Sequence, residues 1–317
     1  MKEIRIAMLG MVDGNGHPYS WSAMFNGYNK EYMEDCGFPV IPRYLEKEPP
    51  ENFGIGNARV THIWTDDPKD AEKVARASKI EHIANKPEDV IGEVDAVIIA
   101  TDKGDEHVRR ARPFIEAGLP MFIDKPLADN VGDLKTILGW VRCGHKILSS
   151  SSLRYTKEYE PYMARTTELG ELRYINMTMP KSWERYGIHA LEPVYCITGG
   201  GYLTVQNTGG IRNNIVHLTH KNGVDVNLAS IYDSAASDLK IVGTRDSVSI
   251  PSKDSYYSFK KQLVEFVNYL ETGVRPYPFE ETIELMEIII AGIRSRNEGG
   301  RRVSLEEIRN EVDSEWK

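Results

Sequence analysis

Apolar runs alternate with helix-forming segments along the first half of the chain. Short apolar runs occupy residues 4–9, 59–64, 94–100 and 120–123, and each of the last three is followed by apolar residues at helical spacing. A further helix is expected over residues 20–28, and residues 33–57, rich in proline and glycine, are expected to form an irregular insertion. Strands that alternate with helices predict a parallel α/β sheet.

The pattern changes in the second half. Extended segments are expected near 171–179, 214–220, 224–232 and 239–250, and Lys221-Asn222-Gly223 predicts a hairpin between the second and third of them. Two amphipathic helices, over residues 259–270 and 283–293, are expected to cover a sheet. We therefore predict an α/β domain over residues 1–128 and an α+β domain over 129–317, the second with a predominantly antiparallel sheet open on one face.

Composition narrows the classes of partner. The 317 residues carry a net charge of −8, which argues against nucleic acid and anionic membranes, because both demand a basic face. The three cysteines form no CxxC pair, so neither a disulfide framework nor a zinc cluster is expected, and a reducing cytoplasm fits best. His217 and His220 would point to opposite faces of a strand, so no metal site is expected there.

The turn after the first strand contains Gly10, Gly14 and Gly16. Glycines at this place let a backbone approach the pyrophosphate of a dinucleotide at a helix start, as in a Rossmann-type domain. The loop lacks the third glycine of the GxGxxG pattern, and a tight turn without a ligand is the alternative.

Asp66 follows the second strand. An acid at this point can bind the hydroxyls of the adenosine ribose and repel a 2'-phosphate, which favours NAD over NADP. The alternative is that Asp66 or Asp67 caps the next helix.

The strongest single feature is Lys125, at the carboxyl end of the fourth apolar run. Open α/β sheets bind ligands at this edge, and a lysine there costs desolvation energy unless it has a role or a partner. Thr101, His107 and Asp124 come from the same edge and complete the candidate cofactor-binding residues.

At these residues the chain resembles the Gfo/Idh/MocA oxidoreductases, relatives of glucose-fructose oxidoreductase and inositol dehydrogenase. Asp124-Lys125-Pro126 is similar to the family's Glu-Lys-Pro motif, in which the bond before proline is often cis. Thr101 and His107 match the Thr-Pro...His segment of the family, whereas Asp102 does not. The resemblance spans nearly the whole chain and implies an NAD(P)-dependent dehydrogenase or reductase.

The second domain carries a further match, to the family pattern Asp-x-Gly-x-His-x-x-Asp. Gly187 and His189 agree with it, Glu192 is a conservative change, and Arg185 replaces the first acid. The resemblance implies that His189 is the acid–base residue, since an imidazole can accept a hydroxyl proton at neutral pH. Lys125 would orient and polarise the reacting oxygen.

Candidate substrate-binding residues are Arg154, Trp183, Tyr186 and Glu192. A surface salt bridge is the alternative role for Arg154. The insertion at 33–57 and residues 181–186 are expected to shape the pocket, but no pattern in them identifies the substrate.

Three functions are compatible with these residues. The leading one is hydride transfer between NAD(P) and a sugar, an inositol-like polyol or a derivative. The others are an NAD-retaining lyase or glycosidase, and a non-catalytic binding or regulatory protein on the same scaffold, suggested by the altered glycine loop and by Arg185. The resemblance further implies a homo-oligomer, either a dimer or a tetramer, formed through the open face of the second sheet.

Overall fold

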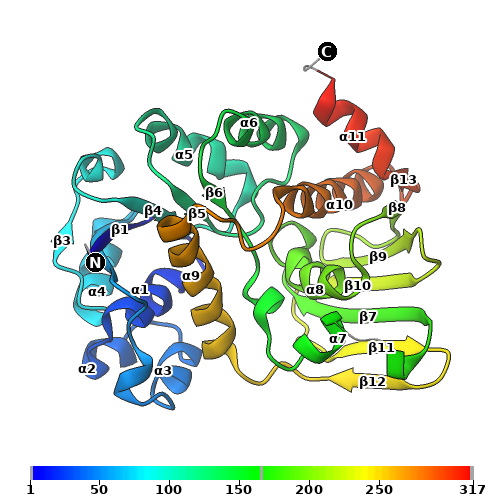
Figure 1. Cartoon of the computed structure of the whole chain (residues 1–317), viewed down its shortest axis with the longest axis horizontal. Coiled ribbons are helices and arrows are strands. Elements are labelled where there is room, and N and C mark those ends of the chain that lie inside the picture. Colours follow the sequence, from blue (N-terminus) through cyan, green and yellow to red (C-terminus); the bar gives the residue numbers. More distant parts are fainter. Residues whose placement is uncertain (1–2, 165–166, 315–317) are drawn as a thin grey trace.

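A computed structural model describes residues 3–164 and 167–314 and shows two layered units side by side (Figure 1). The first is built on a six-stranded sheet with the order β3-β2-β1-β4-β5-β6, in which every pairing is parallel. Its strands are β1 (Ile4–Leu9), β2 (Ala58–Trp64), β3 (His82–Ile83), β4 (Ala96–Ile99), β5 (Met121–Ile123) and β6 (Ile147–Leu148). The predicted parallel α/β sheet is confirmed.

Helices connect these strands. They are α1 (His17–Asn26), α2 (Lys30–Glu34), α3 (Val40–Leu45), α4 (Pro68–Ala77), α5 (His107–Glu116) and α6 (Val131–Arg142), with 3-10 turns at Pro50–Asn52, Pro87–Val90, Gly104–Glu106 and Ser152–Tyr155. The strand order reverses between β1 and β4, which creates the crevice at the carboxyl ends of the strands where such sheets bind ligands.

The insertion at 33–57 is more regular than predicted. It holds the end of α2, the helix α3 and a 3-10 turn, and so the expectation of an irregular segment was wrong. These helices are five and six residues long, too short for apolar spacing to reveal them in the sequence.

The second unit is a seven-stranded mixed sheet with the order β12-β11-β7-β10-β9-β8-β13. Among the described strands of this sheet, only β7 and β10 pair in parallel. The predicted hairpin at Asn222-Gly223 joins β9 to β10. Residues 239–250 form two strands rather than one extended segment, because the chain reverses at 244–246. The strands are β7 (Leu172–Pro180), β8 (Tyr202–Asn207), β9 (Asn213–His220), β10 (Asp225–Ile231), β11 (Leu239–Gly243), β12 (Ser247–Ile250) and β13 (Val303–Ser304).

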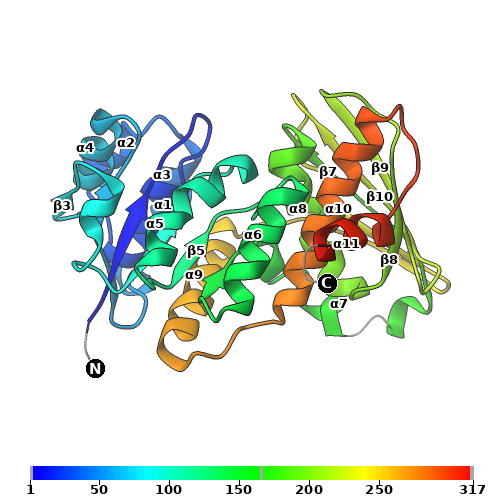
Figure 2. The ribbon, with the colours of Figure 1, turned by 90° about the horizontal axis from the view of Figure 1, so that it is seen from above.

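One face of this sheet is covered by helices and the other is open (Figure 2). The covering helices α8 (Trp183–Thr198), α10 (Phe279–Asn297) and α11 (Leu305–Asp313) lie between the sheet and the first unit. Short helical segments at Glu160–Ala164 (α7) and Thr167–Leu169 precede β7. A homo-oligomer through the open face remains a prediction.

Helix α9 (Ser255–Thr272) returns to the first unit. Phe266 of this helix packs against Phe122 of β5, with ring centroids 5.7 Å apart. The first unit thus takes its sixth strand, at 147–148, and two helices, α6 and α9, from residues beyond the predicted domain boundary at 128/129. The boundary itself stays a prediction. In the part of the chain that the structure describes, no helix is long and apolar enough to span a membrane.

Candidate active site

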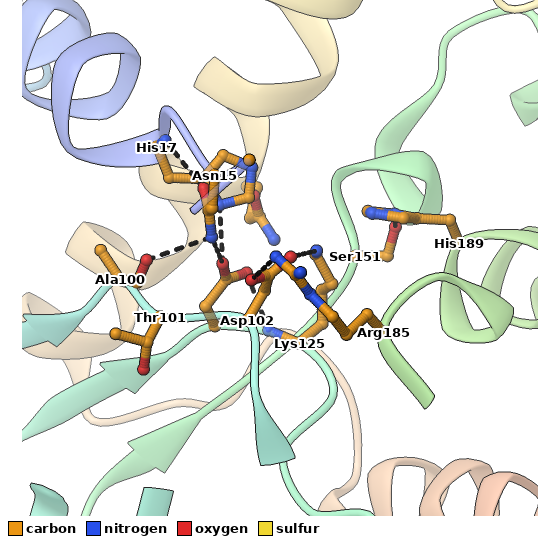
Figure 3. Close-up of polar contacts among 12 residues, drawn as sticks. Asn15, His17, Ala100, Thr101, Asp102, Lys125, Ser151, Arg185 and His189 are labelled. Carbon is orange, nitrogen blue, oxygen red and sulfur yellow. Dashed lines mark hydrogen bonds and ion pairs between the residues drawn. The ribbon is translucent and has the colours of Figure 1, made fainter. Parts of the chain in front are cut away.

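Lys125 lies at the carboxyl end of β5, beside the point where the strand order reverses (Figure 3). Its side chain is 3% exposed, and its Nζ is 3.5 Å from Oδ2 of Asp102, which follows β4. The Lys125–Pro126 peptide bond is cis, as the resemblance led us to expect. Burial by itself would lower the pKa of Lys125, but the negative charges of Asp124 and Asp102 outweigh this effect and raise the pKa. Lys125 is therefore a cation and not a base.

Asp102 and Arg185, two of the departures from the family pattern, bind each other. The Arg185 guanidinium on α8 donates to Oδ1 of Asp102 at 2.6 Å and to the carbonyl oxygen of Asp13 at 3.1 Å. Burial alone would raise the pKa of Asp102, but Lys125 and Arg185 hold it well below its usual range. Relative to the family pattern, α8 has Arg185 in place of an acid, and the segment after β4 has the acid Asp102 in place of a proline. The two residues form an ion pair that joins the two units.

His189 and Lys125 both contact the ring of Tyr186. The Tyr186 ring is 4.9 Å from Nζ of Lys125 and 4.8 Å from the imidazole of His189, centroid to centroid. His189 is 8% exposed, and its Nδ1 is 2.7 Å from the hydroxyl of Ser151. The pKa of His189 is lowered well below its usual value, mainly by burial and to a smaller extent by the charge of Lys125. The ring is therefore neutral at pH 7.

Arg154 and Glu192 form a buried pair beneath Ser151. Arg154 Nε donates to Glu192 at 3.1 Å, and the backbone N–H of Ser151 also donates to Glu192. Arg154 further donates to Glu281 at 3.0 Å and stacks on Tyr277, 3.7 Å from the ring centroid. These two predicted substrate residues contact each other, and Glu192 also contacts Ser151, the residue that binds His189. The alternative role for Arg154, a surface salt bridge, is wrong, because Arg154 is buried.

Trp183 and His107 lie in packed surroundings. Trp183 is fully buried and donates to the carbonyl oxygen of Ile289, and Gly187 makes room for its ring, since a Cβ there would lie 2.5 Å from Trp183. His107 is also buried, with its ring nitrogens 2.7 Å and 3.1 Å from the carbonyl oxygens of Thr101 and Leu127. The structure therefore places both side chains where they support the site from outside it.

The glycines of the first loop meet different structural requirements: a positive φ, the close approach of a neighbouring residue, or both. Gly10 has φ +82°, and a Cβ there would lie 2.7 Å from Thr101. Gly14 also has a positive φ, of +74°. Gly16 has an ordinary φ, but a Cβ on it would lie 2.6–2.9 Å from Ile41 and Phe38, so the insertion packs directly on this glycine.

Asp66 does not cap α4. The capping residue is Asp67, whose side chain accepts a hydrogen bond from the N–H of Lys69 at 2.9 Å. Asp66 instead pairs with Arg110 at 3.0 Å. Arg110 lines a cavity of about 150 Å³ at the carboxyl ends of β1, β2 and β4, together with Leu9, Trp64, Ile99 and Phe114.

Two residues that the sequence analysis missed complete the edge of the sheet. His17 Nδ1 is 2.6 Å from Oδ2 of Asp124, and Asn15 donates to the same oxygen at 3.1 Å. A signal for them was present in the sequence: Asn15 lies within the glycine loop and His17 directly follows it, and that loop and the end of β5 meet at one sheet edge.

Comparisons with known proteins agree with this geometry. Residues 37–151 match the model of the Gfo/Idh/MocA family, described as an oxidoreductase family with an NAD-binding Rossmann fold. A search of curated proteins finds no significant match. Of the predicted cofactor-binding positions, Asp66, Thr101, His107, Asp124 and Lys125 fall inside the matched segment, whereas the glycines at positions 10, 14 and 16 lie before it.

Solved structures show the same fold over nearly the whole chain. Myo-inositol 2-dehydrogenase from Lactobacillus plantarum is 15% identical with a TM-score of 0.74, and 96% of this chain and 99% of that chain are covered. Scyllo-inositol dehydrogenase from Lactobacillus casei, solved with NAD(H) and scyllo-inositol, is 12% identical with a TM-score of 0.72 over 96% and 100%. An oxidoreductase from Agrobacterium radiobacter, solved with NAD+, L-tartaric acid and magnesium, is 14% identical with a TM-score of 0.73 over 97% and 100%. At these identities the likeness establishes the fold.

Proposed function

We propose that this chain, a member of the Gfo/Idh/MocA oxidoreductase family, transfers a hydride between NAD(P) and the hydroxyl or keto carbon of a sugar, an inositol-like polyol or a derivative. The observation that carries the proposal is the buried cation of Lys125 at the strand-end crevice, with His189 across the ring of Tyr186. A buried lysine needs a role or a partner, and here it faces the place where a Rossmann sheet binds its ligand.

The residues of the crevice fit a dinucleotide. The apolar cavity of about 150 Å³ suits a flat base, and Asp66 and Arg110 stand at its edge to meet the ribose. The glycine loop leads to the start of α1, whose first N–H groups are engaged: that of His17 donates to the Asn15 side chain, that of Tyr19 donates to the carbonyl oxygen of Gly16, and Pro18 has none. The buried hydroxyl of Thr101, without a hydrogen-bond partner among the described residues, would serve a bound group.

In the proposed mechanism the hydride and the proton are transferred to different groups. A bound nicotinamide supplies the hydride acceptor or donor. Lys125 would hydrogen-bond the reacting oxygen and stabilise negative charge that develops on it, a role that requires the lysine to stay protonated. His189, neutral in this setting, would take the hydroxyl proton during oxidation and return it during reduction.

Cofactor binding is the first test of the proposal. We expect NAD to raise the melting temperature of the purified protein more than NADP does, because Asp66 repels a 2'-phosphate, although Arg110 beside it weakens that preference. The measurement is differential scanning fluorimetry with each cofactor, followed by a panel of inositols and sugars in which NADH formation is recorded. Product without net NADH would indicate the lyase or glycosidase function, and no binding at millimolar dinucleotide would indicate the non-catalytic one.

The pH dependence of oxidation tests the assignment of His189. A base with a depressed pKa stays neutral, and therefore active, as the pH falls through the usual histidine value of about 6.5. We expect kcat/KM to hold its plateau below that pH, and to fall on the alkaline side only above the usual lysine value of about 10.4, because the pKa of Lys125 is raised. An acid limb at or above pH ~6.5 that disappears in His189→Asn would contradict the depressed pKa.

A further inference from the structure

The second unit places two cations on the glycine loop of the first unit, and neither has a role in the mechanism above. Arg185 reaches from α8 to Asp102 (Figure 3), and it also donates to the carbonyl oxygen of Asp13 at 3.1 Å. Lys181, two residues before the start of α8, donates from Nζ to the carbonyl oxygen of Gly14 at 3.0 Å. Two consecutive carbonyl oxygens of the loop are therefore held by side chains that lie 172 and 167 positions away in the sequence.

Lys181 differs from the neighbouring cations because no carboxylate of the described residues pairs with it. Lys125 and Arg185 both pair with Asp102. Nζ of Lys181 instead has two neutral acceptors, the loop carbonyl oxygen and the hydroxyl of Tyr186 at 2.7 Å, and it lies 4.3 Å from the centroid of the Tyr186 ring. An ammonium group has three N–H donors, so one of them is left for a ligand. The loop therefore carries a positive charge that no described carboxylate balances.

The backbone at Lys181 has a conformation that residues with a Cβ rarely adopt. Its φ is +64°, one of two positive values among the non-glycine residues that the structure describes. The N–H of Lys181 donates to the carbonyl oxygen of Tyr232 at 3.2 Å, and the next residue, Ser182, caps α8. Strained conformations of this kind persist where the surrounding structure enforces them, and they cluster at ligand sites. The position of Lys181 on the loop is therefore enforced from both sides of the residue.

The glycine loop offers hydrogen bonds but no positive charge of its own. The backbone N–H groups of residues 11–14 have no acceptor among the described residues, whereas the first N–H groups of α1 are engaged. The acid of the loop, Asp13, is exposed to solvent. Free N–H groups beside an unbalanced ammonium are complementary to an anion with several oxygens. In a Rossmann-type sheet, the anion that lies at this turn is the diphosphate of the dinucleotide.

We propose that Lys181 binds the diphosphate group of NAD, so that the cofactor site of this chain includes a residue of the second unit. Lys181 is bonded to the glycine loop itself, whereas Lys125, at the end of β5, is the cation assigned to the reacting oxygen. Lys181 thus supplies the positive charge that the loop and the start of α1 lack. The inference rests on the function proposed above, because it requires a dinucleotide at this loop.

The main experiment compares ADP-ribose, which carries the diphosphate, with adenosine, which does not. Dissociation constants are measured by calorimetry, and by ligand-observed NMR for the weaker ligand. Lys181→Met should weaken the binding of ADP-ribose and NAD about 10- to 100-fold, the effect of losing a hydrogen bond from a charged group, and leave that of adenosine unchanged. Lys181→Arg should recover most of the loss. The dissociation constant of ADP-ribose should also rise less steeply with ionic strength in Lys181→Met than in the wild type.

A second substitution separates the loss of charge from a loss of folding. Lys181→Gly also removes the ammonium, but glycine adopts a positive φ without strain, so this variant should melt at or above the wild-type temperature and still bind ADP-ribose weakly. The matched control is Lys79, an exposed lysine just after α4 and the other non-glycine residue with a positive φ, of +54°, in the described chain. Lys79→Met and Lys79→Gly should keep the wild-type dissociation constants for ADP-ribose and NAD.

Each outcome decides the assignment. Unchanged binding of ADP-ribose in Lys181→Met and Lys181→Gly overturns it while the proposed function stands, and a raised KM for an acidic substrate in those variants would then assign Lys181 to the substrate. Equal weakening of adenosine and ADP-ribose also overturns it, because the loss would not depend on the diphosphate. Binding of NAD that depends on Lys181, without oxidation of any polyol or sugar, supports the assignment and contradicts the hydride transfer. If the wild type binds neither ADP-ribose nor NAD, both fail.

Discussion

Replacing Lys125 with methionine is expected to lower kcat/KM for polyol oxidation by about 10²–10³-fold. Methionine has a similar length but no charge, so the variant removes the group that would stabilise the developing alkoxide. The expected loss depends on Lys125 being a buried cation beside Asp102. Steady-state kinetics with the inositol or sugar that the panel identifies would measure it.

The fold of Lys125→Met should survive, which makes the kinetic result interpretable. Asp102 keeps Arg185 at 2.6 Å, and Asp124 keeps Asn15 and His17, so neither carboxylate loses its last partner. Circular dichroism and the NAD dissociation constant would check this. Lys261→Met, in an exposed ion pair with Glu265 on α9, is the matched control and should be as active as the wild type. Wild-type turnover in Lys125→Met would remove Lys125 from the catalytic step.

Replacing Arg154 with methionine is expected to destabilise the protein by about 3–5 kcal/mol. The change leaves the carboxylate of Glu192, whose side chain is 1% exposed, without its ion-pair partner and removes the stacking on Tyr277. A buried charge that loses its ion-pair partner costs far more than the net contribution of the pair, because the remaining ion has lost its water and keeps only the N–H of Ser151 in exchange. Urea denaturation followed by fluorescence would give the change in the free energy of unfolding.

A second substitution distinguishes the loss of charge balance from the loss of packing. Arg154→Met with Glu192→Gln should recover a substantial part of the stability, because glutamine is neutral and can still accept from the N–H of Ser151. Glu281→Gln is the control, since Glu281 binds the same arginine but its side chain is 31% exposed, and it should cost at most about 1 kcal/mol. An equal loss in the single and double variants would mean that the packing of Arg154, and not its charge, carries the stability.

Much of the first unit could be predicted because its signals are local. A buried parallel strand is an apolar run, and the residue that follows it must lie at the sheet edge where ligands bind, so Lys125 was predicted from its position, and the family resemblance added Asp124 and Thr101. The hairpin at Asn222-Gly223 was found for the same kind of reason, since two residues specify the turn. The short helices of the insertion were missed, because five or six residues give no helical period.

The pairing of groups from distant parts of the chain was not predictable in this way. Arg185 appeared in the sequence as a lost acid and Asp102 as a lost proline, and only the structure shows that they form one ion pair across the two units. His17 had no distinguishing neighbour in the sequence, and its contact with Asp124 spans 107 positions. Trp183 and His107 were predicted at the ligand, and only the structure shows that both are buried and hydrogen-bonded to backbone carbonyl oxygens.

The sequence by itself thus determined the sheet type, the edge at which the ligand binds and the charged residue at its centre, because backbone hydrogen bonding and apolar periodicity act over a few residues. The tertiary structure decided which charges neutralise one another and what the insertion covers. Those outcomes depend on desolvation and on contacts between residues far apart in the chain, and no local pattern encodes either.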